Sequence, residues 1–266
     1  MSARLTINGE PAQVDELRVP VATNYGHFTS MRVEGGCVRG LDLHLHRLDA
    51  STRFLFGHSL DGETVRGWLR DAIGGDASAL SVRINVFSRA YNRERPAHDA
   101  KPDVLIAVSN APAGSAQPLR VKSFTYERDV PQVKHVGTFA LFHHRRLAQQ
   151  AGFDDALFVD RDGNVSEGSV WNVAFFDGKR IVWPNALQLE GVSKQLLKRG
   201  FAQHGIENID ASVPLSRIGD FQAAFFTNAA QPVRFIASID NVAFARDDRL
   251  ATQLAACYDS DPPQRI

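Results

Sequence analysis

The stretch "DALFVDRDGNVSEGSVWNVAFF", residues 155–176, has the pattern of two β-strands joined by a short turn. Apolar residues dominate both halves, and the Asp-Gly between them is a strong hairpin signal. The second half, "VSEGSVWNVAFF", residues 165–176, reads as a strand with a glutamate, Glu167, near its start. A glutamate on a strand usually faces water, and a buried one needs a cationic partner or a proton. The stretch therefore predicts β-structure and raises the question of what Glu167 faces.

Length and composition limit the class of protein. The chain has 266 residues, of which 44% are apolar, and this suits two small globular domains. Lys plus Arg and Asp plus Glu each number 30, so we expect no nucleic-acid or membrane partner. Cys37 and Cys257 lie far apart, which favours reduced thiols in a cytoplasmic protein. We expect neither a signal peptide nor a membrane-spanning stretch of roughly 20 apolar residues.

Strand and helix patterns alternate along the whole chain. A helical stripe of leucines covers residues 41–55, and the segments at 79–88 and 103–109 have strand character. The stretch "APAGSAQP", residues 111–118, has the small residues, prolines and glycine of a linker. We therefore predict a mixed α/β (α+β) fold with a smaller N-terminal domain at 1–112, a linker at 113–119 and a larger C-terminal domain at 120–266.

Common catalytic and metal-binding motifs are missing from the sequence. It contains no G-x-G-x-x-G, no P-loop, no H-E-x-x-H and no G-x-S-x-G. The segment "DRDGN", residues 160–164, lacks the full pattern of a calcium loop, so we expect no metal site.

Three features suggest an anionic ligand and an aldehyde. In "HLHRLDAS", residues 44–51, Arg47 shares a helix face with His44 and Ser51, and its planar fork suits a phosphate. In "LEGVSK", residues 189–194, a helix begins after glycine, and free N–H groups at a helix start bind phosphate. Lys134, between a strand and a helix, is able to form a Schiff base if it is sheltered. A surface arginine, a simple helix cap and an exposed lysine are the plainer alternatives.

Taken together, these features resemble the fold-type IV pyridoxal-phosphate enzymes, the class IV aminotransferase family. That family includes branched-chain aminotransferases, D-amino-acid aminotransferases and 4-amino-4-deoxychorismate lyases. The segments that carry the resemblance are "HLHRLDAS", "KHVGTF", "AGFDDALFVDRDGNVSEGSVWNVAFF", "LEGVSK" and "TNAAQPV". The resemblance implies a two-domain fold-type IV architecture with pyridoxal 5'-phosphate between the domains. It also implies a homodimer, with the cofactor lysine on the C-terminal domain.

The resemblance assigns roles residue by residue. Lys134 is implied as the catalytic lysine that forms the internal aldimine. Glu167 is implied to meet the pyridine nitrogen, where a carboxylate keeps the nitrogen protonated and makes the ring an electron sink. The implied phosphate-binding residues are Arg47, Val192, Ser193, Asn228 and Ala229.

The substrate side departs from the family pattern. The family's N-terminal Y-G-D-G-x-F is shortened to "NYGHF", and Phe139 replaces a tyrosine that transaminases often carry five residues after the lysine. Tyr25, Arg32 and Arg83 match substrate-side positions of the branched-chain enzymes, and Arg89 is an alternative to them. An exposed loop arginine is the commoner case.

Three functions remain open at this point. The leading one is a transaminase that moves an amino group between an amino acid or amine and a 2-oxo acid. The second is a 4-amino-4-deoxychorismate lyase that releases pyruvate and 4-aminobenzoate, which Phe139 and the "TNAAQPV" turn favour. The third is a non-catalytic cofactor-binding homologue, which the shortened "NYGHF" favours. The amino donor, the acceptor and the preference for L- or D-substrates are left open.

Overall fold

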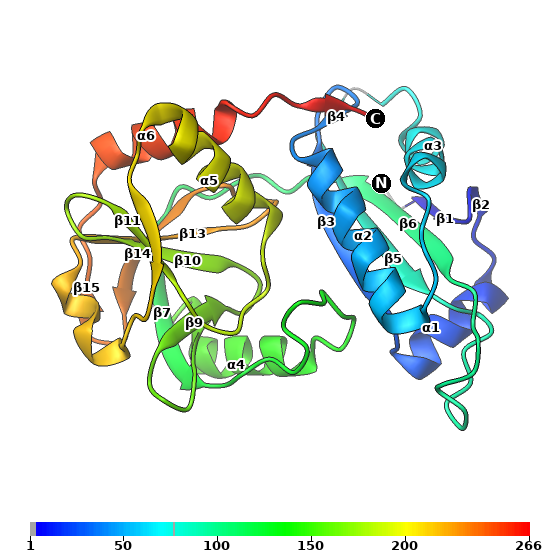
Figure 1. The fold of residues 1–266 in the computed structure, drawn as a ribbon, viewed down its shortest axis with the longest axis horizontal. Helices are drawn as coiled ribbons and strands as arrows, with labels where there is room; N and C mark the ends of the chain where they lie inside the picture. The colour runs from blue at the N-terminus through cyan, green and yellow to red at the C-terminus, as the bar shows by residue number, and fades with distance from the viewer. Residues whose placement is uncertain (1–3, 77) are drawn as a thin grey trace. The chain divides into compact units, whose positions relative to one another are not determined.

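The computed structural model describes residues 4–76 and 78–266. The chain divides into two compact units (Figure 1). The first comprises the described residues up to Ala113 together with Val133–Gly137 and Pro263–Ile266, and the second comprises Gly114–Gln132 and Thr138–Pro262. Both units mix helices with strands, so the predicted mixed α/β fold is confirmed.

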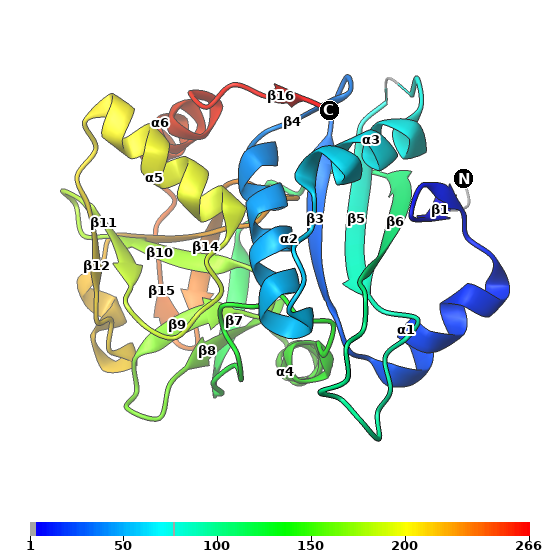
Figure 2. The ribbon, with the colours of Figure 1, turned by 45° about the vertical axis from the view of Figure 1, so that its right-hand side comes forward.

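The first unit is built on an antiparallel sheet with the strand order β2-β1-β6-β5-β3. Figure 2 shows helices α2 and α3 lying along this sheet. The elements of the unit are β1 (Arg4–Ile7), β2 (Glu10–Pro11), η1 (Val14–Leu17), α1 (Arg18–Thr23), β3 (His27–Val33), β4 (Cys37–Val38), α2 (Leu41–Phe56), α3 (Gly62–Ile73), β5 (Leu80–Phe87), β6 (Asp103–Asn110) and β16 (Gln264–Arg265).

Apolar and polar residues alternate along β5, which gives the first sheet one apolar face. Val82 and Ile84 are buried in the cluster that includes Leu48 of α2 and Leu69 of α3. Because successive strand residues point to opposite faces, Arg83 lies on the face away from the two helices. This second face is the one that carries polar side chains.

Two segments from distant parts of the sequence complete the first unit. The backbone of Lys134 accepts a hydrogen bond from the Phe28 N–H at 2.9 Å, and His135 forms an antiparallel bridge with His27. The segment at 133–137 therefore runs along the free edge of β3. In the same unit, β16 pairs with β4, and Ile266 is buried in the core.

These contacts group Lys134 with the N-terminal residues rather than with residues 120–266. The sequence had placed the cofactor lysine on the C-terminal domain, and the domain bounds at 1–112, 113–119 and 120–266 stay a prediction. In the structure, the first continuous segment ends at Ala113, and Gly114 opens the second unit.

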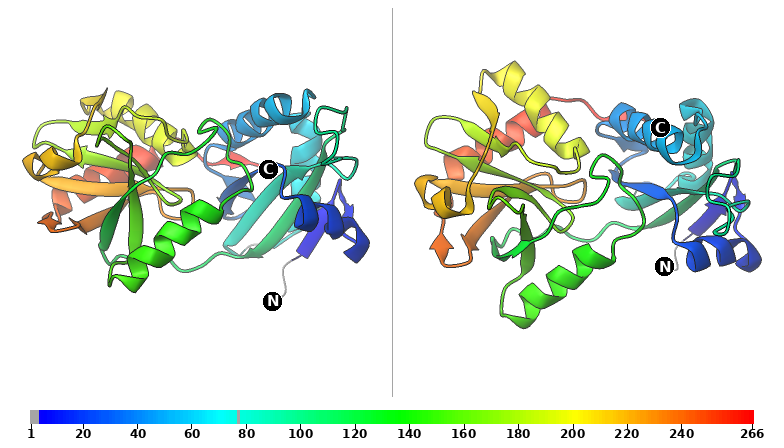
Figure 3. Two further views of the ribbon diagram at one scale, coloured as in Figure 1. Left: turned by 90° about the horizontal axis from the view of Figure 1, so that it is seen from below. Right: turned by 60° about the horizontal axis from the view of Figure 1, so that its bottom comes forward.

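The second unit contains a larger sheet in the order β12-β11-β10-β13-β14-β7-β8-β9, with β15 paired to β14. Helices α5 and α6 lie on one side of it and α4 on another (Figure 3). The elements are β7 (Leu119–Thr125), α4 (Phe139–Gln150), β8 (Asp155–Val159), β9 (Val165–Gly168), β10 (Asn172–Phe176), β11 (Ile181–Pro184), α5 (Val192–His204), β12 (Asn208–Ala211), η2 (Leu215–Asp220), β13 (Ala223–Thr227), β14 (Arg234–Ile239), β15 (Val242–Ala243) and α6 (Asp248–Asp259).

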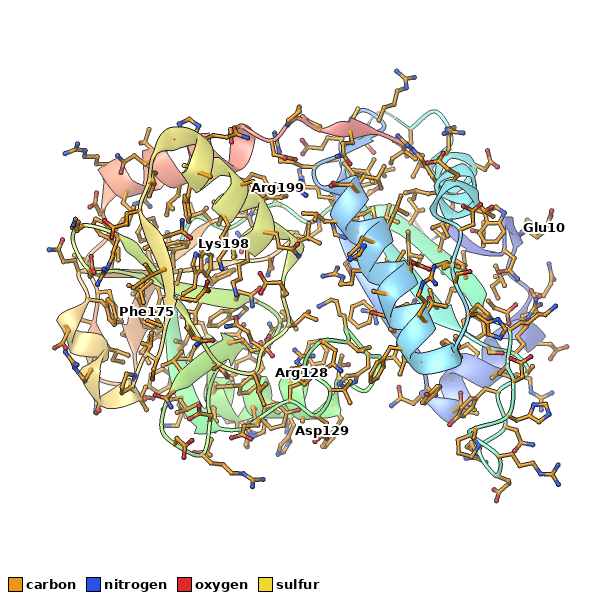
Figure 4. The ribbon with its side chains drawn as sticks, viewed as in Figure 1. Glu10, Arg128, Asp129, Phe175, Lys198 and Arg199 are labelled. Carbon is orange, nitrogen blue, oxygen red and sulfur yellow. The ribbon has the colours of Figure 1, made fainter. Side chains whose placement is uncertain are left out.

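Strand β10 is buried on both faces. Phe175, labelled in Figure 4, packs in an inner cluster, whereas Ala174 belongs to the cluster with Leu197 and Phe201 of α5. The strand is therefore apolar at nearly every position, as expected for a strand covered on both sides.

The prediction of one strand over residues 165–176 is wrong in its middle. The chain forms β9 and β10 with a bend at Ser169–Trp171 between them. A Cβ on Gly168 would lie 2.1 Å from the Trp171 ring, so only glycine permits this close return. The Trp171 ring N–H donates to Asp155 at 2.9 Å, which holds the bend against β8.

None of the helices formed by the described residues is both long and apolar enough to cross a bilayer.

Candidate active site

Lys134 lies beside the ring of Phe28 in the first unit. Its Nζ atom is 4.9 Å from the centre of the Phe28 ring, and the Arg83 guanidinium is 3.5 Å from the same centre. Phe28 is buried, and burial lowers the pKa of Arg83. Neighbouring cations favour the uncharged form of an amine, which is its nucleophilic form. Lys134 thus shares a buried aromatic ring with a second cation, Arg83.

Arg47 is held by a short chain of hydrogen bonds between α2 and β3. Its Nη2 donates to the Thr29 hydroxyl, and Thr29 lies 2.7 Å from Nδ1 of His44. The hydroxyl oxygen receives the arginine N–H, and Nδ1 of a neutral His44 is able to accept the hydroxyl proton. Burial first, and then the charges of Arg47 and Lys134, hold the pKa of His44 well below its usual range.

The guanidinium of Arg47 keeps an unmatched donor. Its Nε is buried and has no hydrogen-bond partner within residues 4–76 and 78–266. Burial lowers the pKa of Arg47 to about 10, so the group is still a cation at neutral pH. A buried cation with an unused N–H suits an anionic ligand.

His27 is a second neutral histidine near Arg47. Its Nε2 lies 3.0 Å from the Thr52 hydroxyl, and that hydroxyl donates to the Leu48 carbonyl at 2.7 Å. Thr52 therefore accepts the imidazole N–H. Burial, followed by the charge of Arg47, lowers the pKa of His27 to about 3. Both histidines remain uncharged at neutral pH and do not add to the positive charge of Arg47.

Glu167 is buried on β9 in the second unit, and a cation accompanies it. Arg128 lies in the loop between β7 and α4 (Figure 4), and its Nε donates to Oε1 of Glu167 at 2.8 Å. The side chains of Arg128 and Glu167 are only 3% and 4% exposed. The other carboxylate oxygen lies 3.4 Å from the Leu189 N–H. The structure thus supplies the cationic partner that a buried glutamate requires.

Asn172 fixes the loop that leads into α5. Its Nδ2 donates to the carbonyl of Leu189 and to the side chain of Gln188, both at 2.8 Å. Glu167 and Asn172 therefore hold the amide and the carbonyl of one residue, Leu189. A Cβ on Gly191 would lie 2.2 Å from the Asn172 oxygen, so the loop packs closely against this side chain.

Helix α5 begins in a buried position without a side-chain cap. Gly191 is its N-cap residue, and Val192 and Ser193 are buried. The first N–H groups of a helix have no acceptor within the helix, so a buried and uncapped start needs another acceptor. The Ser193 hydroxyl is buried and unpartnered within the described part of the chain. The free amides, the dipole and this hydroxyl suit a phosphate.

The turn after β13 contains the remaining predicted phosphate residues. The Asn228 side chain accepts hydrogen bonds from the N–H groups of Ala230 and Gln231 at 3.0 and 2.8 Å. Asn228 therefore shapes the turn, and half-buried Ala229 lies within it. Thr227, just before them, has a buried hydroxyl for which the described residues provide no partner.

Sequence comparison decides the family. Residues 26–239 match the sequence profile described as "Amino-transferase class IV". The chain belongs to the class IV aminotransferase family. A probable branched-chain-amino-acid aminotransferase of Rickettsia bellii (strain RML369-C) is 26% identical over 257 residues, which cover 88% of this chain and 86% of the relative.

Solved structures agree with the fold of this class IV aminotransferase. A hypothetical aminotransferase from Mycobacterium tuberculosis, in a PLP-bound form, has a TM-score of 0.83 at 18% identity, and the match covers 98% of this chain and 100% of that one. A putative 4-amino-4-deoxychorismate lyase of Legionella pneumophila has a TM-score of 0.78 at 21% identity, and the match covers 91% and 93%. The predictions of the family, of fold type IV and of a class IV transaminase are confirmed.

The substrate-side predictions of this aminotransferase remain predictions, and the structure ranks them. Arg89 is bound to Asp103 at 2.8 Å and also to Glu16, which neutralises its charge. Arg32 donates to Glu34 at 2.7 Å. Arg83 shares the Phe28 ring with Lys134 and is the arginine best placed to meet a group bound by that lysine.

Tyr25 is held in place on the same unit. Its hydroxyl donates to the Leu55 carbonyl at 3.1 Å, and its ring stacks on Tyr91 with centroids 4.4 Å apart. Tyr25 therefore presents a fixed aromatic face rather than a free hydroxyl donor.

The sequence reasoning missed Arg128, Thr29 and Thr227. A buried Glu167 called for a cation, but several arginines were equally possible from the sequence. Thr29 lies on β3, where most residues are buried. Nothing in the sequence distinguished it from the other residues of this strand. Thr227 ends a strand, and its role depends on which atoms the fold leaves unpaired.

Proposed function

We propose that this class IV aminotransferase uses pyridoxal 5'-phosphate and that Lys134 is its catalytic lysine. The observation that carries the proposal lies in the second unit. Leu189 donates its N–H to Glu167, and only two residues later the buried, uncapped start of α5 begins at Gly191. One short loop thus joins a carboxylate to a helix start that is able to bind an anion. A ligand with a cationic ring nitrogen and a phosphate would need both groups, the carboxylate for the nitrogen and the helix start for the phosphate.

The chain's residues would fit the phosphate and the ring nitrogen of the cofactor. The amides of Val192 and Ser193 would bind the phosphate, with Arg47 and the turn at Asn228 and Ala229 as further contacts. Glu167 would hold the proton on the ring nitrogen. The PLP-bound form of the related Mycobacterium tuberculosis aminotransferase supports this choice of cofactor. When bound, pyridoxal phosphate serves as the electron sink for a carbanion at the substrate α-carbon.

Lys134 has two tasks in the proposed reaction. Its amine would hold the cofactor, and the same amine would move a proton at the substrate α-carbon. Arg83, which lies over the same Phe28 ring as Lys134, is the cation that would favour an uncharged amine.

The proposed substrates are amino acids and 2-oxo acids. Arg83, on the polar face of the first sheet, would bind the substrate carboxylate as a planar cation. The relatives named as branched-chain aminotransferases make branched-chain amino acids the first donors to test. A homodimer and a cytoplasmic location are also proposed. The family resemblance supports the dimer, and the unpaired Cys37 and Cys257 suit a reducing compartment.

A lyase is the second candidate. Phe139 lacks the hydroxyl of the transaminase tyrosine, and a putative aminodeoxychorismate lyase is a structural neighbour. In the structure Phe139 is 79% exposed at the start of α4, where its ring stacks on His143. A non-catalytic homologue is disfavoured because the chain has both Lys134 and Glu167, and binding alone needs no electron sink.

The test is the visible absorption spectrum of the protein with pyridoxal phosphate, before and after adding L- and D-amino acids without any oxo acid. A band that one class of donor removes establishes a transaminase and its stereochemistry. A band that survives every donor and accompanies pyruvate release from aminodeoxychorismate establishes the lyase.

A matched pair of variants tests Lys134 itself. Lys134→Ala should abolish the band. Lys122→Ala should not, although the Lys122 amine also lies over a phenyl ring, that of Phe153, at 5.4 Å. An unchanged band in Lys134→Ala would refute the assignment of the catalytic lysine.

A further inference from the structure

The Arg128–Glu167 pair is formed entirely by residues of the second unit. Arg128 comes from a loop and Glu167 from β9, and their charged atoms are 2.8 Å apart. Both side chains are almost completely buried. Glu167 also lies beside the Leu189 amide, which leads to the helix start proposed to bind phosphate. The pair is therefore next to the proposed cofactor site and not on the surface.

Two further titratable groups, Tyr126 and Asp129, come from the same loop as Arg128. Tyr126 lies close to Arg128 and Glu167. Burial raises its pKa, the charge of Arg128 opposes this, and Asp129 adds to it. His144 of α4 packs its ring on Tyr126.

On the neighbouring strand β8, Asp155 is bound by Arg145 at 2.8 Å and by the hydroxyl of Ser169. On α5, Lys194 pairs with Glu190 at 2.8 Å. These two cations are thus engaged with other carboxylates, whereas Arg128 is in direct contact with Glu167.

A buried ion pair is a poor way to gain stability alone. The desolvation of two charges offsets most of their attraction, and apolar residues of similar size often serve as well. The presence of a buried ion pair is easier to explain when a ligand at the site needs one of its two charges. Here the carboxylate is the group that a protonated ring nitrogen requires.

We infer that Arg128 is a positioning residue that keeps Glu167 ionised and fixes its carboxylate before the cofactor binds. The inference rests on the proposed function for the ligand of Glu167, whereas the ion pair itself is testable without any ligand. Arg128 acts through Glu167 and does not itself take part in the chemistry.

The first test is the unfolding midpoint of the cofactor-free protein and its variants at pH 5 and pH 8. In Arg128→Met, burial without the cation favours a protonated Glu167, while the unfolded chain loses that proton above about pH 4.3. The folded variant thus binds one proton more than its unfolded chain. Relative to the unsubstituted protein, its midpoint should fall more at pH 8 than at pH 5.

The double variant Arg128→Met, Glu167→Gln separates charge from packing. It should be more stable than Arg128→Met alone, and the extra pH dependence should vanish. Arg128→Lys keeps the charge and should retain most of the stability at both pH values. The inference would be overturned if Arg128→Met lowered the unfolding midpoint equally at both pH values. It would also be overturned if adding Glu167→Gln did not raise the midpoint again. If Arg128→Met alone fails to fold, folding of the double variant takes its place as the supporting result.

The second test counts the protons taken up when pyridoxamine 5'-phosphate binds, by calorimetry at pH 7 in buffers of different ionisation heat. Both proteins should end with the same pair, an ionised Glu167 and a protonated ring nitrogen. Because Arg128→Met starts with a proton on Glu167, its uptake should be about one proton lower than that of the unsubstituted protein. Arg145→Met, which breaks the half-buried ion pair between α4 and Asp155 of β8, should leave the proton count unchanged.

The outcomes distinguish this inference from the proposed function. If the unsubstituted protein does not bind pyridoxamine phosphate, the proposed function fails, and the pH test alone decides the role of the pair. If it binds and Arg128→Met has the same proton count, the inference fails and the proposed function stands.

Discussion

At Ser193 a buried hydroxyl lies at the start of α5 without a partner within residues 4–76 and 78–266. An unmet buried hydroxyl costs about 1–3 kcal/mol, so Ser193→Ala should leave the cofactor-free protein as stable as before, or more so by about 1 kcal/mol. Loss of a hydrogen bond to a phosphate should weaken pyridoxal phosphate binding by about tenfold. Urea unfolding and a cofactor titration measure the two effects.

Ser169 provides the control for that substitution. Its hydroxyl donates to Asp155 at 2.6 Å and accepts from Arg145 at 2.9 Å, so Ser169→Ala should destabilise the cofactor-free protein. An equal loss of stability in Ser193→Ala would show that its hydroxyl has a structural partner and would remove it from the phosphate site.

The two buried histidines of the first unit make stability depend on pH. The folded pKa of His27 is about 3 and that of His44 is well below its usual range, while both titrate near pH 6.5 when unfolded. Their contribution is therefore complete above about pH 6.5 and is lost as the pH falls. At pH 5, His27 should have cost about 2 kcal/mol of unfolding free energy relative to neutral pH, and His44 should lower the stability in the same direction.

Urea unfolding at pH 7, 6 and 5 measures this slope. His27→Gln keeps a side chain able to donate to Thr52 and removes one titrating group, so its stability should fall less steeply between pH 6 and pH 5. An identical slope in the variant would mean that His27 takes up a proton in the folded protein.

At the scale of elements, the loop between β11 and α5 depends on the close approach of Gly191 to Asn172. Gly191→Ala would put a Cβ 2.2 Å from the Asn172 oxygen, so the loop or the side chain must move. Such overpacking should cost about 1–3 kcal/mol. Because the loop ends at the proposed phosphate site, cofactor affinity should fall as well.

Gly67, in the middle of α3, is the matched control. A Cβ there meets nothing within 4 Å, and alanine is the better helix former, so Gly67→Ala should stabilise by about 0.5–1 kcal/mol. The same urea unfolding experiment measures both variants. Equal effects at the two positions would mean that the loop before α5 adapts without cost.

Element types were predictable from the sequence where apolar periodicity was strong. Helix α2 and the strands β5 and β10 follow their patterns, and Gly191 marks the start of α5 as expected. The bend between β9 and β10 was not predictable, because it depends on the packing of the Trp171 ring over Gly168. The partner of Glu167 was not predictable either, since Arg128 reaches it through the fold of the sheet.

At the scale of the whole molecule, each compact unit is not one continuous stretch of sequence, since the first unit includes Val133–Gly137 and Pro263–Ile266. From composition, the sequence predicted a linker at 113–119, because linkers are rich in small residues and proline, and these bounds stay a prediction. It did not predict that Lys134 would lie along β3, nor that the segment at 263–266 would return to the first unit. Both depend on backbone pairing between distant segments, for which a single sequence carries little signal.

The segment at 263–266 should therefore stabilise the first unit although it follows the whole of the second in sequence. Ile266 is buried in the core of the first unit, and Gln264 of β16 exchanges hydrogen bonds with Asp42 at 2.8 and 3.0 Å. Ile266→Ala should cost the first unit about 2 kcal/mol or more, because it leaves a cavity in a packed core. Removal of residues 263–266 should cost more, because the β16–β4 pairing is lost too.

Trp68 reports on this unit, since it packs against the same core, whereas Trp171 and Trp183 lie in the clusters of the second unit. Urea unfolding followed by Trp68 fluorescence, with Trp171 and Trp183 replaced by phenylalanine, should show a lower midpoint for Ile266→Ala. Leu187→Ala, an apolar truncation at a position that is 66% exposed, should leave the midpoint unchanged. Truncation of a buried isoleucine lowers the free energy of unfolding of any core that depends on it. An unchanged urea midpoint of Trp68 fluorescence in Ile266→Ala would therefore mean that the core of the first unit does not depend on its C-terminal strand.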